Sequence, residues 1–119
     1  MEESTSKPVV ATAPAPHGKP TRVCPEFHQA VELVGKRWTG AILGALIERP
    51  HYFAELTASI PGLSDKLLSQ RLRELEEEGI VDRSVHPGSP ARVSYALTDK
   101  GRDLEAAIVE LRDWARRWK

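Results

Sequence analysis

The sequence predicts a mainly α-helical domain with one small β-hairpin near its C-terminal end. Apolar residues recur at helical spacing over residues 25–34, 37–48, 53–59 and 64–78. Over residues 81–97 the pattern changes to alternation, interrupted by a segment rich in Pro and Gly. Helical spacing then returns and continues to residue 118, so a last helix is expected after the hairpin.

Length, composition and charge restrict the class of protein. The chain has 119 residues, of which 40% are hydrophobic and 29% charged, as is typical of a soluble globular protein. Residues 1–22 are rich in Pro, Ala and Thr, which predicts a disordered leader before a single domain over residues 23–119. No secretory signal or membrane-length apolar run is apparent, and one cysteine cannot form an internal disulfide. We therefore expect a cytoplasmic protein without membrane contact.

Pro and Gly delimit the first three helices. Pro25 suits a first helical turn because its missing N–H would be unpaired there anyway, and Gly35 is expected to end this helix. The second helix, residues 37–48, has apolar side chains around much of its circumference and is expected to be the central buried helix. A short helix over residues 53–59 then ends at a Pro-Gly pair.

The fourth helix and the hairpin define the architecture. Ser64 is expected to cap the fourth helix, and Leu68, Leu72 and Leu75 form its buried stripe. A tight Gly-containing turn joins it to the short helix before it, as in a helix-turn-helix. The hairpin follows at once over residues 81–97, and Thr98 caps a last helix that extends to residue 118. This order is the winged helix-turn-helix arrangement.

Residues 24–118 resemble the HxlR family of bacterial winged-helix transcriptional regulators, whose architecture is close to that of the MarR regulators. The resemblance rests on the order and spacing of CP at 24–25, GKRWTGAIL at 35–43, FAEL at 53–56, IPGLSDKLLSQRLRELEEEGIV at 60–81, PARVSYALTDKG at 90–101 and a closing amphipathic helix with Trp114. It implies a homodimer that binds a double-stranded DNA operator with an inverted repeat, and repression is the expected effect. It implies nothing about the leader.

The fourth helix has an outward face whose chemistry suits DNA. Its front half carries cations and its back half glutamates, and the predicted contacts are Lys66, Ser69, Gln70 and Arg73. A recognition helix reads bases with its N-terminal residues. Arg or Lys suits guanine edges or phosphates, and Gln suits adenine. Glu77 faces the same side without an assigned role. A solvated helix of mixed charge is the alternative, which the hairpin and the resemblance disfavour.

Four further side chains near this face are candidates for DNA contact, and their positions make two of them stronger than the others. Ser64 is expected to cap the helix and to offer its hydroxyl to a phosphate. Arg92 follows the hairpin tip, where a wing arginine reaches a phosphate or a narrow minor groove, although it could also be an ordinary exposed arginine. Arg83 ranks lower because its alternation with Val81 places it on the packed face. Arg71 ranks lower because it lies at the edge of the buried face.

The first and last helices are expected to form a dimer interface. The helix over residues 98–118 carries more apolar surface than so small a domain can cover, although it could pack across its own domain. Pairing two copies would match the two-fold symmetry of a palindromic operator. The predicted interface residues are Phe27, Val31, Leu104, Ile108, Leu111, Trp114 and Trp118.

Cys24 immediately precedes Pro25 at a helix N-terminus, a position that stabilises a thiolate. Some HxlR-type regulators use a cysteine at the matching place to sense oxidants, quinones or other electrophiles, so the resemblance makes Cys24 a candidate sensor of an oxidant or small-molecule effector. A plain capping residue is the equal alternative. Any disulfide would have to join two subunits or a small thiol.

Three other functions have less support in the sequence. Cys24 and His28 provide only two ligands, so no metal or other cofactor is predicted. No third group orients this pair, which argues against an enzyme. A winged-helix protein-interaction module without direct DNA readout is compatible with the formal net charge of zero. Outward-facing Lys66, Gln70 and Arg73 favour DNA over that alternative.

Overall fold

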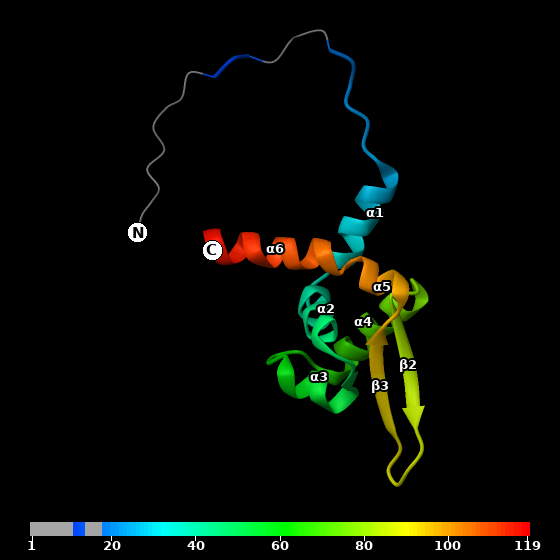
Figure 1. Ribbon diagram of the computed structural model, residues 1–119. Helices are drawn as coiled ribbons and strands as arrows, with labels where there is room; N and C mark the ends of the chain where they lie inside the picture. The colour runs from blue at the N-terminus through cyan, green and yellow to red at the C-terminus, as the bar shows by residue number, and fades with distance from the viewer. Residues whose placement is uncertain (1–10, 14–17) are drawn as a thin grey trace.

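The mainly helical class with a small antiparallel sheet is confirmed in the computed structural model, which describes residues 11–13 and 18–119. The elements follow in the order α1 (Pro25–Val34), α2 (Thr39–Glu48), β1 (His51–Tyr52), α3 (Phe53–Ser59), α4 (Asp65–Glu77), β2 (Val81–His86), β3 (Arg92–Leu97), α5 (Asp99–Asp103) and α6 (Glu105–Trp118). In Figure 1 the hairpin projects from one end of the domain, and α1 and α6 lie at the opposite end.

The leader predicted for residues 1–22 falls largely outside the described residues. Residues 1–10 and 14–17 are not described. Within the described part, residues 11–13 and 18–22 belong to no helix or strand, and their side chains are exposed. Among the described residues, regular structure begins at Pro25, as the sequence predicts.

The core lies where α2, α3 and α4 meet the base of the hairpin. Leu68, Leu72 and Leu75 are buried, so the predicted stripe of α4 is confirmed. Their partners are apolar side chains of the other elements, including Ile42, Leu43, Leu46, Leu56, Val81 and Tyr95. Burying one such side chain contributes about 1.5–3 kcal/mol. This packing fixes which face of α4 remains outside.

Helix α2 begins at Thr39, two residues later than the helix predicted over residues 37–48. The cause is Trp38, whose φ of 78° places it in the left-handed region, which is uncommon for a bulky residue. This conformation turns the indole ring against the core, beside Gly62. The turn from α1 into α2 is closed by a hydrogen bond from the Thr39 N–H to the Lys36 carbonyl at 3.1 Å.

The sheet has a strand that the sequence pattern did not predict. The order is β1–β3–β2, with His51 opposite Tyr95 and Tyr52 opposite Ser94. A strand of two residues is too short to show alternation. Helix α3 starts directly after it, and the Tyr52 N–H donates to the Glu55 carboxylate at 2.8 Å. The pKa of Glu55 lies below its usual value, mainly because of this bond and secondly because of the hydrogen bonds from the Arg49 side chain.

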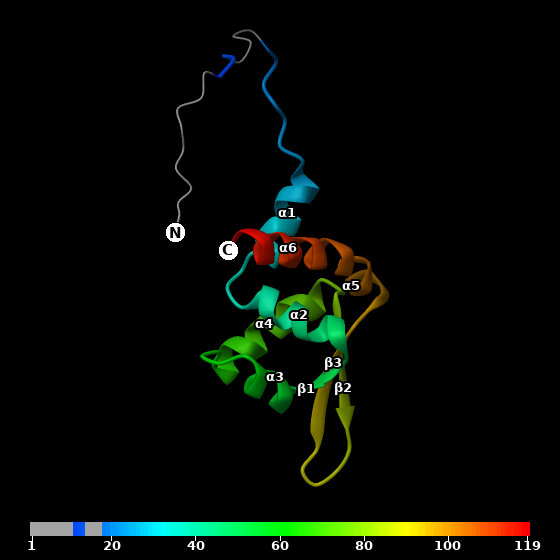
Figure 2. The same ribbon diagram turned by 60° about the vertical axis from the view of Figure 1, so that its left-hand side comes forward.

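The single last helix predicted after Thr98 is interrupted at Leu104, which separates α5 from α6. The cap itself is confirmed, because Thr98 Oγ1 accepts the Gly101 N–H at 3.0 Å. Helix α5 lies against the carbonyl of Ile80, whereas α6 crosses α2, so the two segments follow different packing surfaces. Figure 2 shows α6 passing over α2, and Figure 1 shows its C-terminal end projecting past the helices below it. Among the described residues, no helix combines the length and apolar character needed to span a membrane.

Candidate nucleic-acid interface

Helix α4 is held at both its start and its buried side. Ser64 caps it as predicted, its Oγ accepting the Leu67 N–H at 3.1 Å. Asp65 suits the positive end of the helix dipole, and its carboxylate accepts the Thr57 hydroxyl of α3 at 3.2 Å. With Leu68 fully buried, the orientation of the outward face is set by the core.

The outward face of α4 brings the predicted contact residues together. One shallow hollow is lined by Lys66, Ser69, Gln70, Arg73, Glu74 and Glu77. Lys66, Gln70 and Arg73 are exposed, and Ser69 is half-buried. The four predicted contacts of this helix therefore form one continuous surface. Ser64 lies at its edge, at the start of the helix.

Arg92 joins this surface from the wing. It is the first residue of β3, and it lines a second hollow together with Tyr52, Phe53 and Ser69. Ser69 therefore belongs to both hollows. Two segments that are distant in the sequence, the recognition helix and the wing, thus present polar and cationic groups side by side. We define Lys66, Ser69, Gln70, Arg73 and Arg92 as the contact face.

The glutamate nearest the core on this helix is neutralised by neighbouring cations. Glu74 pairs with Lys36 at 3.1 Å and with Arg71 at 3.4 Å. Arg71 also donates from Nε to the carbonyl of Arg37 at 2.9 Å. The Arg71 guanidinium already binds groups of its own chain, which agrees with the expectation that Arg71 is a weaker candidate for DNA contact.

Ion pairs do not occupy the cations of the contact face. Within residues 18–119, Lys66, Arg73 and Arg92 form no salt bridge with a carboxylate. Glu77 shares the hollow with Arg73 without pairing to it. No carboxylate within residues 18–119 therefore has to be displaced before these cations contact a phosphate.

Arg83 lies on the predicted face of the sheet, but the expectation that it is packed there is wrong. Arg83 lies opposite Tyr95 and so on the core-facing side of the sheet, yet its side chain is exposed. The reason is the strand order, because β2 is the outer strand and the core ends at Val81. Val85, farther along this strand, is also exposed.

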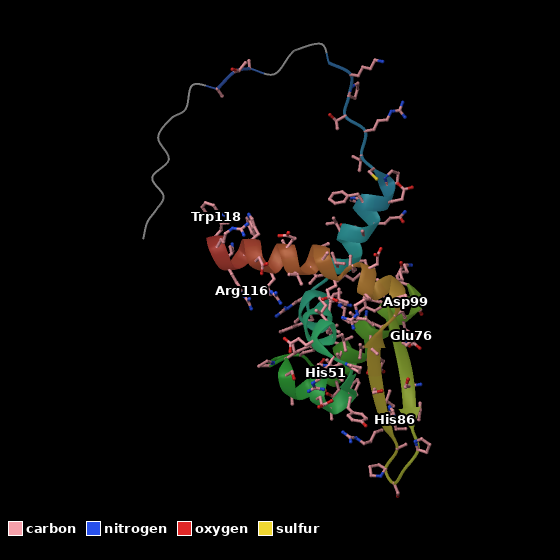
Figure 3. The ribbon with its side chains drawn as sticks, viewed as in Figure 1. His51, Glu76, His86, Asp99, Arg116 and Trp118 are labelled. Atoms are coloured by element: carbon pink, nitrogen blue, oxygen red, sulfur yellow. The ribbon has the colours of Figure 1, made fainter. Side chains whose placement is uncertain are left out.

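The predicted dimer residues divide into two groups. Leu104 and Ile108 are half-buried and pack against the core of their own domain. The others are exposed, with accessible fractions of 60% for Leu111, 48% for Trp114 and 72% for Trp118 on α6, and 68% for Phe27 and 45% for Val31 on α1. Figure 3 shows Trp118 at the far end of α6. The second group leaves an uncovered apolar surface at the end of the molecule opposite the wing.

Cys24 is the N-cap residue of α1 and is exposed. Its Sγ accepts the Phe27 N–H at 3.4 Å, and its thiol faces the Glu26 carboxylate at 3.4 Å. The pKa of Glu26 is held below its usual value, first by a hydrogen bond to its own backbone and then by the Cys24 thiol. No group of three or more metal-ligating side chains occurs within residues 11–13 and 18–119.

A helix-turn-helix followed by a wing, with a cationic face on the second helix, defines the class of winged helix-turn-helix DNA-binding regulators. The family model for the HxlR-like helix-turn-helix matches residues 33–119, and the chain belongs to that family. The protein is therefore a transcriptional regulator of the helix-turn-helix type and not an enzyme.

Curated relatives and solved structures agree with this family. The chain is 43% identical to the regulator YvaP of Bacillus subtilis over 82% of this chain and 91% of that protein. It is 45% identical to YodB of Bacillus subtilis over 78% of this chain and 83% of that protein. Reduced YodB matches with a TM-score of 0.71 at 43% identity over 82% and 95%. Two further structures of YodB also match, one of the diamide-treated protein and one of the quinone-bound protein.

Two further solved structures extend the comparison to redox and MarR-type regulators. The redox regulator HypR in its oxidised form matches with a TM-score of 0.75 at 31% identity, over 81% of this chain and 98% of that one. A MarR-family regulator from Porphyromonas gingivalis matches with a TM-score of 0.76 at 26% identity, over 87% and 100%. The MarR-like architecture expected from the sequence is confirmed.

Proposed function

We propose that this protein is a homodimeric, sequence-specific transcriptional repressor that binds an inverted-repeat operator through the contact face. The observation that carries the proposal is the joint position of Lys66, Ser69, Gln70 and Arg73 on one exposed face of α4, with Arg92 across a shared hollow. The front of α4 enters the major groove and reads base edges. Arg92 reaches the phosphates or the minor groove beside it.

The two-fold symmetry of a dimer explains why the expected operator is an inverted repeat. Two copies of α4 related by a two-fold axis bind two half-sites about one helical turn of DNA apart, about 34–36 Å. The uncovered apolar side chains of α1 and α6 lie at the end away from the wing, so pairing there leaves both contact faces free. Binding of such a dimer to an operator that overlaps a promoter blocks transcription.

Replacing Arg73 or Arg92 by Ala should weaken operator binding without unfolding the protein. Each change removes an exposed cation, and the expected loss is about 1–3 kcal/mol, roughly 5- to 150-fold in Kd. If the lost contact is to a phosphate, the slope of log Kd against log salt should fall by about one. A gel-shift titration at several salt concentrations measures both quantities.

Arg116→Ala is the matched control for these two variants. Arg116 is an exposed arginine in the last turn of α6, far from the wing (Figure 3), so its loss should leave operator affinity unchanged. Wild-type affinity in both Arg73→Ala and Arg92→Ala would reject the contact face. The protein-interaction module would then be the better account of the fold.

We further propose that Cys24 makes DNA binding responsive to oxidants or electrophiles. The thiol is exposed at a helix N-terminus, where the Phe27 N–H faces the sulfur. Support also comes from two relatives, since YodB has been solved in reduced, diamide-treated and quinone-bound forms and HypR is a redox regulator. Diamide takes two electrons and two protons from two Cys24 thiols, which leaves an intersubunit disulfide and a hydrazine.

The Cys24→Ser variant should keep wild-type operator affinity and lose the response to diamide. Ser is a good N-cap residue, so α1 should remain capped. In the wild type, diamide should change operator affinity, and reducing agent should restore it. Gel shifts with and without diamide measure the response, and non-reducing electrophoresis detects the disulfide. An equal response in Cys24→Ser would remove Cys24 from the sensing role.

A further inference from the structure

The outer face of the sheet carries an aromatic and cationic cluster next to the contact face. The Cζ atom of Arg92 lies 3.5 Å from the centroid of the Tyr52 ring. The His86 ring meets the same ring nearly edge-on, with centroids 5.5 Å apart and an interplanar angle of 69°. Nε2 of His86 lies 2.8 Å from the Ser94 hydroxyl. Figure 3 places His86 on the wing.

Tyr52 connects the helix-turn-helix to the wing. Its backbone pairs with Ser94 of β3, and its N–H donates to Glu55 in the first turn of α3. The ring is therefore anchored at the start of the helix-turn-helix, whereas Arg92 belongs to the wing. Stacking between the two side chains links the wing to β1 and to the start of α3, the first helix of the helix-turn-helix.

We propose that Tyr52 is a positioning residue for DNA binding, which holds the Arg92 guanidinium in one orientation on the wing before DNA arrives. The inference rests on the proposed role of Arg92 as a wing contact. A free arginine side chain has many rotamers, and binding must select one of them. A guanidinium that already lies on an aromatic face has lost most of that freedom in the unbound protein. The position of the wing cation relative to the start of the helix-turn-helix is thereby preset.

The stack leaves the arginine able to bind DNA. At 3.5 Å from the ring centroid the guanidinium lies on the ring face. Its five N–H donors lie in its own plane and point away from its edges, so stacking does not consume them. Within residues 18–119, no side-chain hydrogen bond or salt bridge engages the Arg92 guanidinium. The donors are therefore available to a phosphate or to base edges.

A double-mutant cycle separates positioning from a general structural role. The variants are Tyr52→Phe, Tyr52→Leu, Arg92→Ala and Tyr52→Leu/Arg92→Ala. The probe is a duplex of about 30 base pairs, selected by the wild-type protein from a random pool and long enough for two half-sites. Tyr52→Leu should weaken binding roughly 3- to 10-fold, whereas Tyr52→Phe, which keeps the ring, should bind within about twofold of wild type. In the Arg92→Ala background, Tyr52→Leu should cost nothing further.

Salt dependence provides a second measure. Tyr52→Leu should leave the slope of log Kd against log salt unchanged, because the Arg92 contact still forms, whereas Arg92→Ala should lower it by about one. If Tyr52→Leu weakened binding equally in the wild-type and Arg92→Ala backgrounds, the positioning role of Tyr52 would be rejected, but the proposed wing contact of Arg92 would not. Tighter binding by Tyr52→Leu would also overturn the positioning role, because the stack would then mask the arginine. Wild-type affinity in Arg92→Ala would instead reject the proposed wing contact itself. Thermal unfolding confirms that each variant is folded.

Discussion

The Leu111→Glu variant should be monomeric at micromolar concentration, where the wild type is expected to be a dimer. Its affinity for a two-half-site operator should fall by at least about a hundredfold, because a monomer binds only one half-site and loses the avidity of the linked pair. This affinity loss is expected to lie near or above the upper end of the range expected for a single change on the contact face, which is roughly 5- to 150-fold. Sedimentation velocity measures the first effect, and gel shifts with whole and half operators measure the second.

The reason is the apolar surface on the terminal helices. Leu111, Trp114 and Trp118 follow one another at helical spacing along the exposed side of α6, and Phe27 and Val31 are exposed on α1. A monomeric soluble protein rarely exposes so many large apolar side chains near one another. In Figures 1 and 2 both helices extend away from the core at the same end of the molecule. A glutamate in the middle of this surface would have to lose its hydration on pairing, which is costly.

Ala106→Glu is the matched control for Leu111→Glu. Ala106 is exposed on the same helix, and helical geometry places it well away from the stripe that contains Leu111. The added charge is the same, so this variant should remain a dimer with full operator affinity. A dimeric Leu111→Glu protein, or a wild type that sediments only as a monomer, would contradict the proposed interface.

The Gly101→Ala variant should lose about 3 kcal/mol of stability or fail to fold. A Cβ atom at position 101 would meet the backbone carbonyl oxygen of Ile80 at less than any distance that packed atoms tolerate, and would crowd its Cγ2. That carbonyl is held in place because it accepts the Thr98 N–H at 3.0 Å. Overpacking against an immobile backbone costs roughly 1–3 kcal/mol and occasionally more. This exceeds the gain of up to about 1 kcal/mol that Ala brings to a helix.

The same junction holds the end of the recognition helix. Lys100 donates from Nζ to the carbonyl of Glu78 at 2.6 Å, and the Thr98 hydroxyl donates to the carbonyl of Gly79 at 2.5 Å. These bonds satisfy the carbonyls of the two residues that directly follow α4. Displacing α5 should therefore also release the end of α4, so any folded fraction of Gly101→Ala should bind the operator more weakly.

Gly40→Ala is the control for the glycine substitution. Gly40 lies in α2 with an exposed face, and an added Cβ would meet nothing within 4 Å. Ala should stabilise the protein there by about 0.5–1 kcal/mol. Urea unfolding followed by circular dichroism measures both variants. A Gly101→Ala protein as stable as the wild type would show that the Ile80 carbonyl can move aside.

Local sequence pattern was sufficient for the recognition helix and its outward face. The spacing of Leu68, Leu72 and Leu75 specifies which side is buried, and Ser64 specifies where the helix begins, because both signals act within a few residues. The opposite side then follows from helical geometry, which is why Lys66 and Arg73 could be placed in advance. The hairpin was predictable for a similar reason, since alternation and turn residues are local.

Only the tertiary structure decided the features that depend on contacts between distant segments. The strand His51–Tyr52 exists because β3 offers it hydrogen-bonding partners, and two residues carry no period of their own. The break at Leu104 arises because α5 and α6 pack on different surfaces. The stack of Arg92 on Tyr52 joins the wing to the helix-turn-helix, and a one-dimensional pattern contains no information on such a pair. Periodicity determines which face of an element is apolar, whereas the packing of elements on one another determines which side chains meet.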